Sequence, residues 1–212
     1  MIITVAHKKG GVGKSTISTN LSIAFDSTVL DLDGLSSSVL FNQLRQHNGK
    51  EPINCLKAQT VDSAKKILIE YQHSPNMLIV DSGGYDDNIN RLALVAANMI
   101  ITPLSPTQID LFGLQDFEQI LKLASEQFKT NIISHVLINR ADIRSKNDIL
   151  GLRKFVNKRP DTFKLFRTVL HDRKDYERAY AVGQSVIEYN PADNAALEVK
   201  QLAKEIKQIL GL

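Results

Sequence analysis

A glycine-rich segment near the amino terminus combines residue types that bind phosphate. It reads Lys8-Lys9-Gly10-Gly11-Val12-Gly13-Lys14-Ser15-Thr16 and stands between a short apolar run and a segment of helical period. Glycines let the backbone curl so that successive N–H groups face one anion, and the amino terminus of a following helix adds partial positive charge. The sequence therefore predicts a phosphate-binding loop between a strand and a helix.

The last residues of this loop predict how a nucleoside triphosphate is held. Lys14 is expected to reach the β- and γ-phosphates, Ser15 to ligate Mg²⁺, and Thr16 to donate to the α-phosphate. The usual spacing G-x-x-x-x-G-K-[ST] fails at one position, because Lys8 stands where the first glycine is expected. The expected nucleotide-binding residues of the loop are Gly10, Gly11, Val12, Gly13, Lys14, Ser15 and Thr16.

Three carboxylates follow apolar runs that read as buried strands. Asp81 comes directly after Met77–Val80, and we expect it to hold water molecules of a bound Mg²⁺ without entering the inner coordination sphere. Asp31 and Asp33 come at the end of Thr28–Leu32. We expect Asp31 to be an exposed acid at the end of its strand.

The elements that must position these residues alternate between strands and helices. Short aliphatic runs separated by longer segments of helical period are typical of βαβ units. The predicted fold is α/β, with three layers: a mostly parallel, twisted sheet and helices on both faces. The predicted strands are Ile2–Val5, Thr28–Leu32, Met77–Val80, Met99–Thr102, Ile132–Ile138 and, more weakly, Phe163–Phe166. The predicted helices are Lys14–Phe25, Ser37–Arg45, Val61–Tyr71, Asn88–Ala96, Leu111–Phe128, Lys146–Val156 and Ala192–Leu210.

Composition fits one globular domain over residues 1–212. The chain is 43% hydrophobic and 23% charged. It has neither an apolar run of the ~20 residues that cross a bilayer nor a signal pattern, so we expect a cytoplasmic protein. Its single cysteine, Cys55, excludes an intramolecular disulfide and a metal site made only of cysteines.

Several motifs together resemble the ParA/MinD superfamily of deviant Walker A ATPases. Lys9 ahead of the paired glycines is similar to the signature lysine of that box, Asp31-Leu32-Asp33 to the Walker A′ aspartates, and Met77 to Gly84 to Walker B with its switch loop. Further matches are Ile101–Thr107 with Asp110-Leu111-Phe112-Gly113, Val136–Arg140, and a ParA-like segment from Arg173 to Glu188. The predicted first strand begins at Ile2, and in this respect the chain resembles the small, ParF-like members of the superfamily. Specific operator binding is not expected for this type.

The resemblance implies roles for individual residues. Lys9 would reach the nucleotide of the opposite subunit. Asp33 would position or activate the attacking water, as the second aspartate of the Walker A′ box does in the family. The expected catalytic residues are Lys9, Lys14 and Asp33. Asn139 would lie beside the adenine. The expected cofactors are ATP and Mg²⁺, and the expected assembly is a homodimer that ATP stabilises and hydrolysis dissolves.

The basic residues are unevenly distributed, which predicts a DNA surface. The net charge is only +3, but residues 140 to 178 hold twelve basic against six acidic side chains. The expected partners are nonspecific DNA, which would place the protein on the nucleoid, and a ParB-like adaptor or centromere-binding protein. The candidate DNA contacts are Arg153, Lys154, Lys158, Arg159, Arg173 and Lys174.

Other functions stay open at this point. One is the positioning of a protein assembly, such as a chemoreceptor array or microcompartment, in place of a plasmid or chromosome. A MinD-like membrane switch would use the last helix, although Glu198 and Glu205 between its lysines favour docking onto the sheet. A small-molecule P-loop kinase or ligase would bind ATP without needing Lys9.

Overall fold

A seven-stranded sheet forms the centre of the molecule, and all of its strand pairs are parallel. The computed structural model describes residues 1–34, 37–84 and 87–212. The strand order is β3-β2-β4-β1-β5-β6-β7. The strands are β1 Ile2–Val5, β2 Thr28–Asp31, β3 Cys55–Lys57, β4 Leu78–Asp81, β5 Met99–Leu104, β6 Ser134–Ala141 and β7 Phe163–His171.

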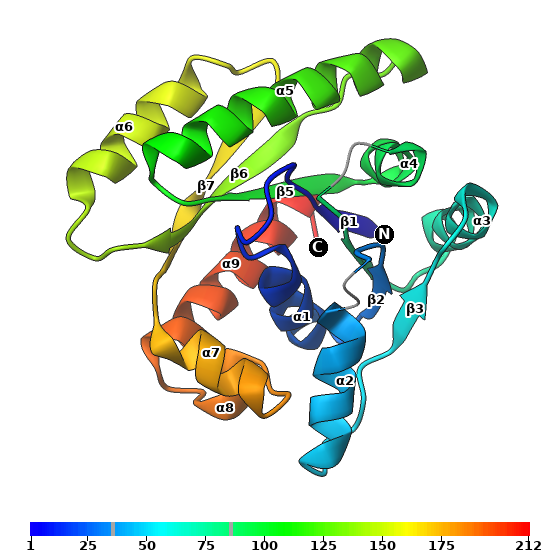
Figure 1. Ribbon diagram of the computed structural model, residues 1–212, viewed down its shortest axis with the longest axis vertical. Coiled ribbons are helices and arrows are strands. Elements are labelled where there is room, and N and C mark those ends of the chain that lie inside the picture. Colours follow the sequence, from blue (N-terminus) through cyan, green and yellow to red (C-terminus); the bar gives the residue numbers. More distant parts are fainter. Residues whose placement is uncertain (35–36, 85–86) are drawn as a thin grey trace.

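Helices connect the strands and cover both faces of the sheet (Figure 1). They are α1 Lys14–Phe25, α2 Ser37–His47, α3 Val61–Gln72, α4 Asn88–Ala96, α5 Gln108–Phe128, α6 Lys146–Asn157, α7 Lys174–Ala181, α8 Val186–Tyr189 and α9 Asn194–Leu210. The predicted three-layer α/β fold is confirmed, and the sheet is parallel throughout the part of the chain that the structure describes.

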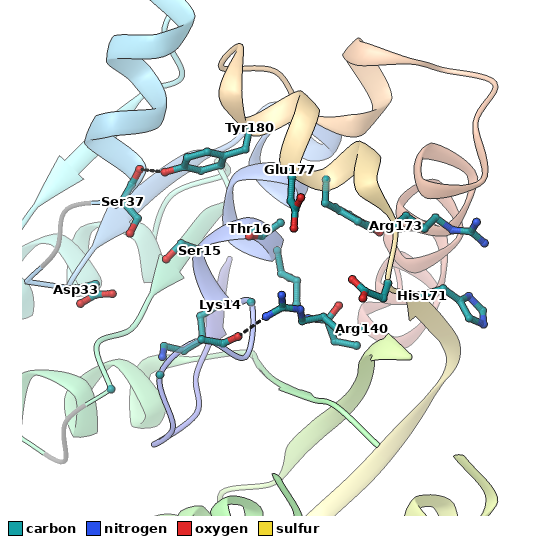
Figure 2. A pocket seen from close by; sticks show the side chains of 18 of the residues that line it. Lys14, Ser15, Thr16, Asp33, Ser37, Arg140, His171, Arg173, Glu177 and Tyr180 are labelled. Carbon is teal, nitrogen blue, oxygen red and sulfur yellow. Dashed lines mark hydrogen bonds between the residues drawn. The ribbon is translucent and has the colours of Figure 1, made fainter. Parts of the chain in front are cut away.

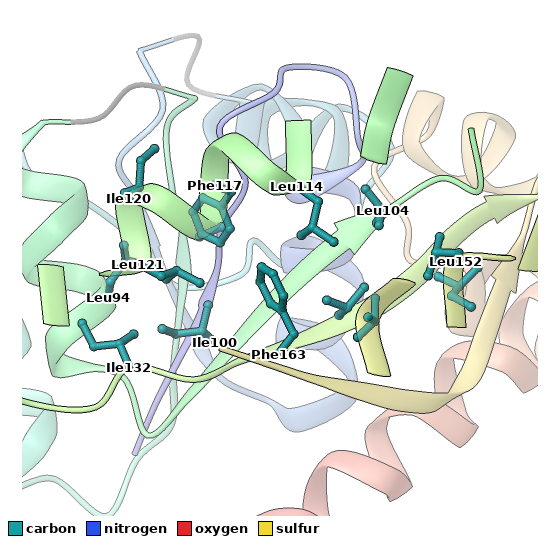
Figure 3. Close-up of a cluster of buried hydrophobic side chains, with 14 of the residues drawn as sticks. Leu94, Ile100, Leu104, Leu114, Phe117, Ile120, Leu121, Ile132, Leu152 and Phe163 are labelled. Atoms are coloured by element: carbon teal, nitrogen blue, oxygen red, sulfur yellow. The ribbon is translucent and has the colours of Figure 1, made fainter. Parts of the chain in front are cut away.

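The alternation of side chains along the strands divides the core between two faces. On one face, Ile3 and Ile79 pack with Leu21 of α1 and Leu202 of α9. On the other face, α3 and α4 cover β2, β4 and β1, while α5 and α6 cover β5 and β6. Figure 3 shows this second packing around Leu114 and Phe117 of α5. The two covered faces leave the carboxyl ends of the strands free to form a site.

The carboxyl-terminal third of the chain contains elements that the sequence analysis did not identify. Helices α7 and α8 lie beside α2 and α1, and Tyr180 of α7 packs against Phe41 of α2. Strand β7 is longer than predicted and ends at His171. Helix α9 docks on the sheet as expected, with Val199, Leu202 and Ile206 buried. No helix in the described ranges is long and apolar enough to cross a membrane.

Candidate functional site

A pocket of about 830 Å³ opens at the carboxyl ends of the strands. Its floor is the loop from Lys8 to Thr16, and α7 together with the end of β7 forms the opposite wall (Figure 2). Loop residues Gly10, Gly11, Gly13, Lys14, Ser15 and Thr16 all line it. The structure therefore brings together most of the residues expected to bind nucleotide. Val12 is buried and does not line the pocket.

The loop has the backbone conformation that an anion site requires. Gly11 and Gly13 have φ values of 74° and 97°, in the left-handed region that favours glycine. Gly13 is the N-cap residue of α1 and gives it no side-chain cap. The first N–H groups of α1 are therefore available to a phosphate, and the helix dipole favours negative charge at the same point.

Lys14 projects from the first position of α1 and is largely buried. Its Nζ lies 3.3 Å from the carbonyl oxygen of Lys9. Burial lowers the pKa of Lys14, while the nearby carboxylates of Asp81 and Asp33 raise it. A buried ammonium group with few partners has most to gain from an anion, as expected for the lysine that faces the β- and γ-phosphates.

Asp81 lies beneath Ser15 and is fully buried. Ser18 Oγ donates to its Oδ1 at 3.2 Å, Ser38 Oγ lies 3.5 Å from its Oδ2, and Ser15 also bonds to the carboxylate. Burial raises the pKa of Asp81 to about 7, against the opposing effects of Ser15 and Lys14. This environment fits Mg²⁺, because a cation bound at Ser15 would offset the cost of burying a carboxylate. Ser18 and Ser38 belong to no motif that predicts a site, so their contacts with Asp81 could not be predicted from the sequence.

The expectation that Asp31 is an exposed acid is wrong. Asp31 is only 4% exposed, and it accepts hydrogen bonds from the backbone N–H groups of Asp33 and Ser38 at 3.0 and 3.1 Å. Burial raises its pKa, while these two bonds lower it. Its role is to shape the turn after β2, which brings Asp33 to the wall of the pocket.

Asp33 itself lines the pocket and is half-buried. The start of α2, a few residues further along, is tied to the opposite wall. Tyr180 of α7 donates from its hydroxyl to the carbonyl oxygen of Ser37 at 2.8 Å (Figure 2). The segment after β2 is therefore connected to α7 across the pocket.

Lys9 lies outside this pocket, although it belongs to the loop. Its Nζ donates to the carboxylate of Asp110, at the start of α5. Burial raises the pKa of Asp110, but the bonds from Lys9 and Thr107 hold it below its usual value. The loop thus has one lysine in its own pocket and another directed away from it. Asp110 belongs to the segment Asp110-Leu111-Phe112-Gly113 that resembles the family, but the resemblance did not predict its contact with Lys9.

Asn139 supports the loop from β6. Its side-chain amide donates to the carbonyl oxygen of Val12 at 2.8 Å. A Cβ atom at Gly13 would lie 2.5 Å from the same amide nitrogen, so this close approach requires glycine. Asn139 lines the pocket, but it also holds the phosphate-binding loop in place.

The candidate DNA contacts differ in how available they are. Lys154, Lys158 and Lys174 are exposed, and Arg153 is half-buried. Arg159 instead donates to Glu118 at 3.1 Å, and Arg173 donates to Glu198 at 2.7 Å. Because their guanidinium groups are held in ion pairs within the chain, Arg159 and Arg173 are less available to DNA than the exposed lysines, and their place among the DNA contacts stays a prediction.

A parallel sheet with a glycine loop, an uncapped helix amino terminus, and a lysine and serine at its start defines a P-loop nucleotide-binding protein. Residues 3–186 match the family described as the CobQ/CobB/MinD/ParA nucleotide binding domain. The chain belongs to this family.

Known proteins with different tasks are similar to this chain. The maintenance of carboxysome distribution protein A of Gloeobacter kilaueensis is 24% identical over 213 residues, covering 97% of this chain and 93% of that protein. A Borrelia burgdorferi B31 protein assigned to plasmid partition, bound to AMPPNP, has a TM-score of 0.71 at 15% identity, covering 98% of both chains. The septum site-determining protein MinD of Pyrococcus horikoshii, complexed with Mg-ADP, has a TM-score of 0.72 at 17% identity. This match covers 99% of this chain and 97% of the MinD chain. These solved structures support the fold.

Proposed function

We propose that the protein is a Mg²⁺-dependent ATPase whose ATP-bound form is a homodimer that binds nonspecific DNA and positions a cargo. The observation that carries this proposal is the contrast between the two lysines of the loop. Lys14 faces the pocket of its own chain, whereas Lys9 lies outside it and pairs with Asp110. A second lysine directed away from its own pocket is suited to a phosphate in another chain.

Within one chain, each group has a defined part in binding and hydrolysis. The loop N–H groups and Lys14 hold the phosphates, and Thr16 contacts the α-phosphate. Ser15 ligates Mg²⁺, and Asp81 holds it through water. The bound cation would polarise the γ-phosphate and neutralise charge during phosphoryl transfer. Asp33, on the pocket wall, orients the attacking water.

Between chains, Lys9 would exchange one anion for another. In the free chain it is paired with Asp110, whose side chain is only 7% exposed. In the dimer it would leave Asp110 for the γ-phosphate of the partner, so ATP selects the associated state. Ile109 and Phe112 flank Asp110 and are 69% and 59% exposed, which provides apolar surface for such an interface.

The DNA surface would centre on the exposed basic side of α6. Arg153, Lys154 and Lys158 provide charge there, and Lys174 adds charge at the start of α7. Phosphate contacts of this kind need no base recognition. A ParB-like adaptor is the proposed partner that stimulates hydrolysis, and the proposed location is the nucleoid in the cytoplasm.

A second candidate function is the positioning of a protein assembly on DNA. It is favoured by the 24% identity to a carboxysome distribution protein over nearly the whole chain. This function would use the same ATP-dependent dimerisation and DNA binding, and it differs only in the adaptor protein that links the dimer to its cargo. A MinD-like membrane switch is less well supported, because the apolar side of α9 packs against the sheet.

The test measures association and DNA binding together. Wild type and Lys9→Ala are compared by light scattering and DNA binding with ATP, ADP and no nucleotide, with Lys65→Ala, an exposed lysine of α3, as the control outside the pocket. We expect ATP to produce dimers and DNA binding in wild type and Lys65→Ala, and neither in Lys9→Ala. Normal dimerisation of Lys9→Ala, or DNA binding that is equally strong without ATP, would contradict the proposal.

A further inference from the structure

Two consecutive residues at the end of β6 hold the phosphate-binding loop. Asn139 donates to the carbonyl oxygen of Val12 at 2.8 Å, and Arg140 Nη1 donates to the carbonyl oxygen of Gly11 at 2.9 Å. In Figure 2, the dashed line that starts at Arg140 marks its hydrogen bond to the loop. Both acceptors are loop carbonyl groups, and they are adjacent in the sequence.

An irregularity in the sheet allows neighbouring residues to reach the same loop. Ile138 pairs with Val169 and Ala141 with His171, so β6 has one more residue than β7 between these positions. In a regular strand, Asn139 and Arg140 would point to opposite faces of the sheet. The extra residue breaks this alternation, since Ile138 and Ala141 both pack in the core under α5 and α6.

The backbone of Arg140 is the unusual part of this bulge. Its φ is 53°, in the left-handed region that a residue with a long side chain rarely adopts. Such conformations occur where the surrounding structure determines them, often at functional sites. The side chain is exposed and is anchored by its bond to Gly11, so core packing does not explain the conformation.

The geometry of the peptide unit connects these two bonds to phosphate binding. In a trans peptide, the C=O and N–H groups point in opposite directions. Fixing the carbonyl groups of Gly11 and Val12 toward β6 therefore directs the N–H groups of Val12 and Gly13 away from β6. In the described part of the chain, neither N–H group donates to another residue, so both are donors without a partner in the chain, and Gly13 lines the pocket.

We propose that Asn139 and Arg140 form a clamp that presets the N–H groups of Val12 and Gly13 for polyphosphate. This proposal deepens the proposed function and rests on it for the identity of the ligand. Arg140 also lines the pocket, and the proposal gives it a positioning role through the Gly11 carbonyl group in place of a direct contact with the phosphates. The clamp raises affinity because the loop is ordered before the nucleotide arrives.

The test measures the binding of Mg-ATP and of Mg-tripolyphosphate, which lacks base and ribose, by calorimetry. Arg140→Asn keeps a residue that tolerates the left-handed region but is too short to reach Gly11. We expect it to weaken both ligands about tenfold and to the same extent, with no loss of melting temperature. Arg140→Lys should recover most of the affinity. Arg144→Asn is the matched control and should bind both ligands as wild type does.

A double variant separates the clamp from a direct contact with phosphate. Because Asn139 and Arg140 hold the same loop, we expect the affinity losses of Asn139→Ser and Arg140→Asn not to multiply when combined. Losses that multiply, unchanged affinity of Arg140→Asn, weaker ATP binding with unchanged tripolyphosphate binding, or a lowered melting temperature would each overturn the clamp. The proposed function fails separately, if wild type does not bind Mg-ATP or if Lys14→Ala binds it as tightly.

Discussion

Asp81 at the end of β4 and Asp33 just after the neighbouring strand β2 are suited to different roles because their surroundings differ. Asp81 is fully buried under Ser15 and Ser18, whereas Asp33 is half-buried on the wall of the pocket. A buried acid fixed by hydroxyl groups suits a site for a hydrated cation. An acid in contact with solvent suits work on water.

We predict that Asp33→Ala binds ATP normally but hydrolyses it at least ~10²-fold more slowly, because it loses the group that orients water. Calorimetry and phosphate release measure the two effects separately. Asp62→Ala, an exposed acid of α3, serves as the control and should hydrolyse ATP at the wild-type rate. Unchanged turnover in Asp33→Ala would move this role to another residue.

The protonation of His7 makes the free energy of unfolding depend on pH. It is buried and stacked on Phe117, and its Nδ1 accepts the N–H of Lys9 at 2.8 Å. Burial, followed by the charge of Lys14, lowers its pKa to about 4. Between pH 6.5 and about 4 the unfolded chain therefore binds more protons at this position than the native one, and stability falls as pH falls.

We predict that His7→Asn removes this part of the pH dependence. The slope of unfolding free energy with pH should decrease by up to about 1.4 kcal/mol per pH unit in this window. Urea unfolding at pH 5 and pH 7.5 measures it. His47→Asn, an exposed histidine, is the control and should keep the wild-type slope. An equal slope in His7→Asn and wild type would refute the assignment.

At the scale of elements, the sequence predicted most of the helices from the apolar side chains that recur along one side, and the central strands from short apolar runs, because these strands are buried on both faces. Strand β3, Cys55–Lys57, was missed because it has only three residues, two of them half-buried and one exposed, and so produces no pattern. Helix α7 was missed because it is short and largely polar, with Ala179 its one buried residue. Both elements are held by tertiary contacts, which a local pattern does not contain.

The same reason explains which parts of the site could be predicted. Lys14, Ser15 and Asp81 belong to motifs in which spacing determines geometry. Asp110 and Arg140 act on the loop from more than 100 residues away, and no local spacing encodes such contacts.

A buried ion pair joins α2 to the segment that contains α8. Arg45 donates to both carboxylate oxygens of Glu188, at 2.9 and 3.0 Å, and to the carbonyl oxygen of Gly183 at 2.8 Å. Its side chain is only 7% exposed. Burial raises the pKa of Glu188, but the bonds from Arg45 and Ser185 outweigh this effect and leave it lowered.

We predict that Arg45→Met lowers the free energy of unfolding by about 2 kcal/mol, since it leaves the Glu188 carboxylate and the Gly183 carbonyl without this partner. Urea unfolding measures the change. Arg178→Met removes an exposed pair with Asp175 and should cost about 0.5 kcal/mol or less. Similar losses in both variants would contradict a structural role for the buried pair.

At the scale of the whole molecule, the proposed function makes DNA affinity depend on how many basic side chains the proposed dimer brings together. We predict that log affinity with ATP falls linearly with log salt, with a slope of about −0.9 per phosphate neutralised, and is independent of base sequence. Lys154→Glu/Lys158→Glu should weaken binding and flatten this slope, whereas Lys65→Glu/Lys66→Glu, on the exposed side of α3, should not.

Fluorescence anisotropy over a salt series measures these slopes. Intact DNA binding by the α6 double variant, with dimerisation retained, would place the DNA surface on another element. Binding that changes with base sequence would contradict recognition through phosphates alone.

The outer edge of the sheet at β7 has a consequence for how copies of this protein assemble. An open strand edge is a template on which another chain can add a strand. Here Glu205 of α9 accepts the N–H groups of Arg167 and Thr168, Glu198 accepts that of His171, and Arg153 of α6 donates to the carbonyl oxygen of Arg167. The exposed side chains of Lys164 and Arg167 add like charge along the strand. The protein's own side chains therefore occupy part of this edge, and we expect β7 not to accept a strand from another copy.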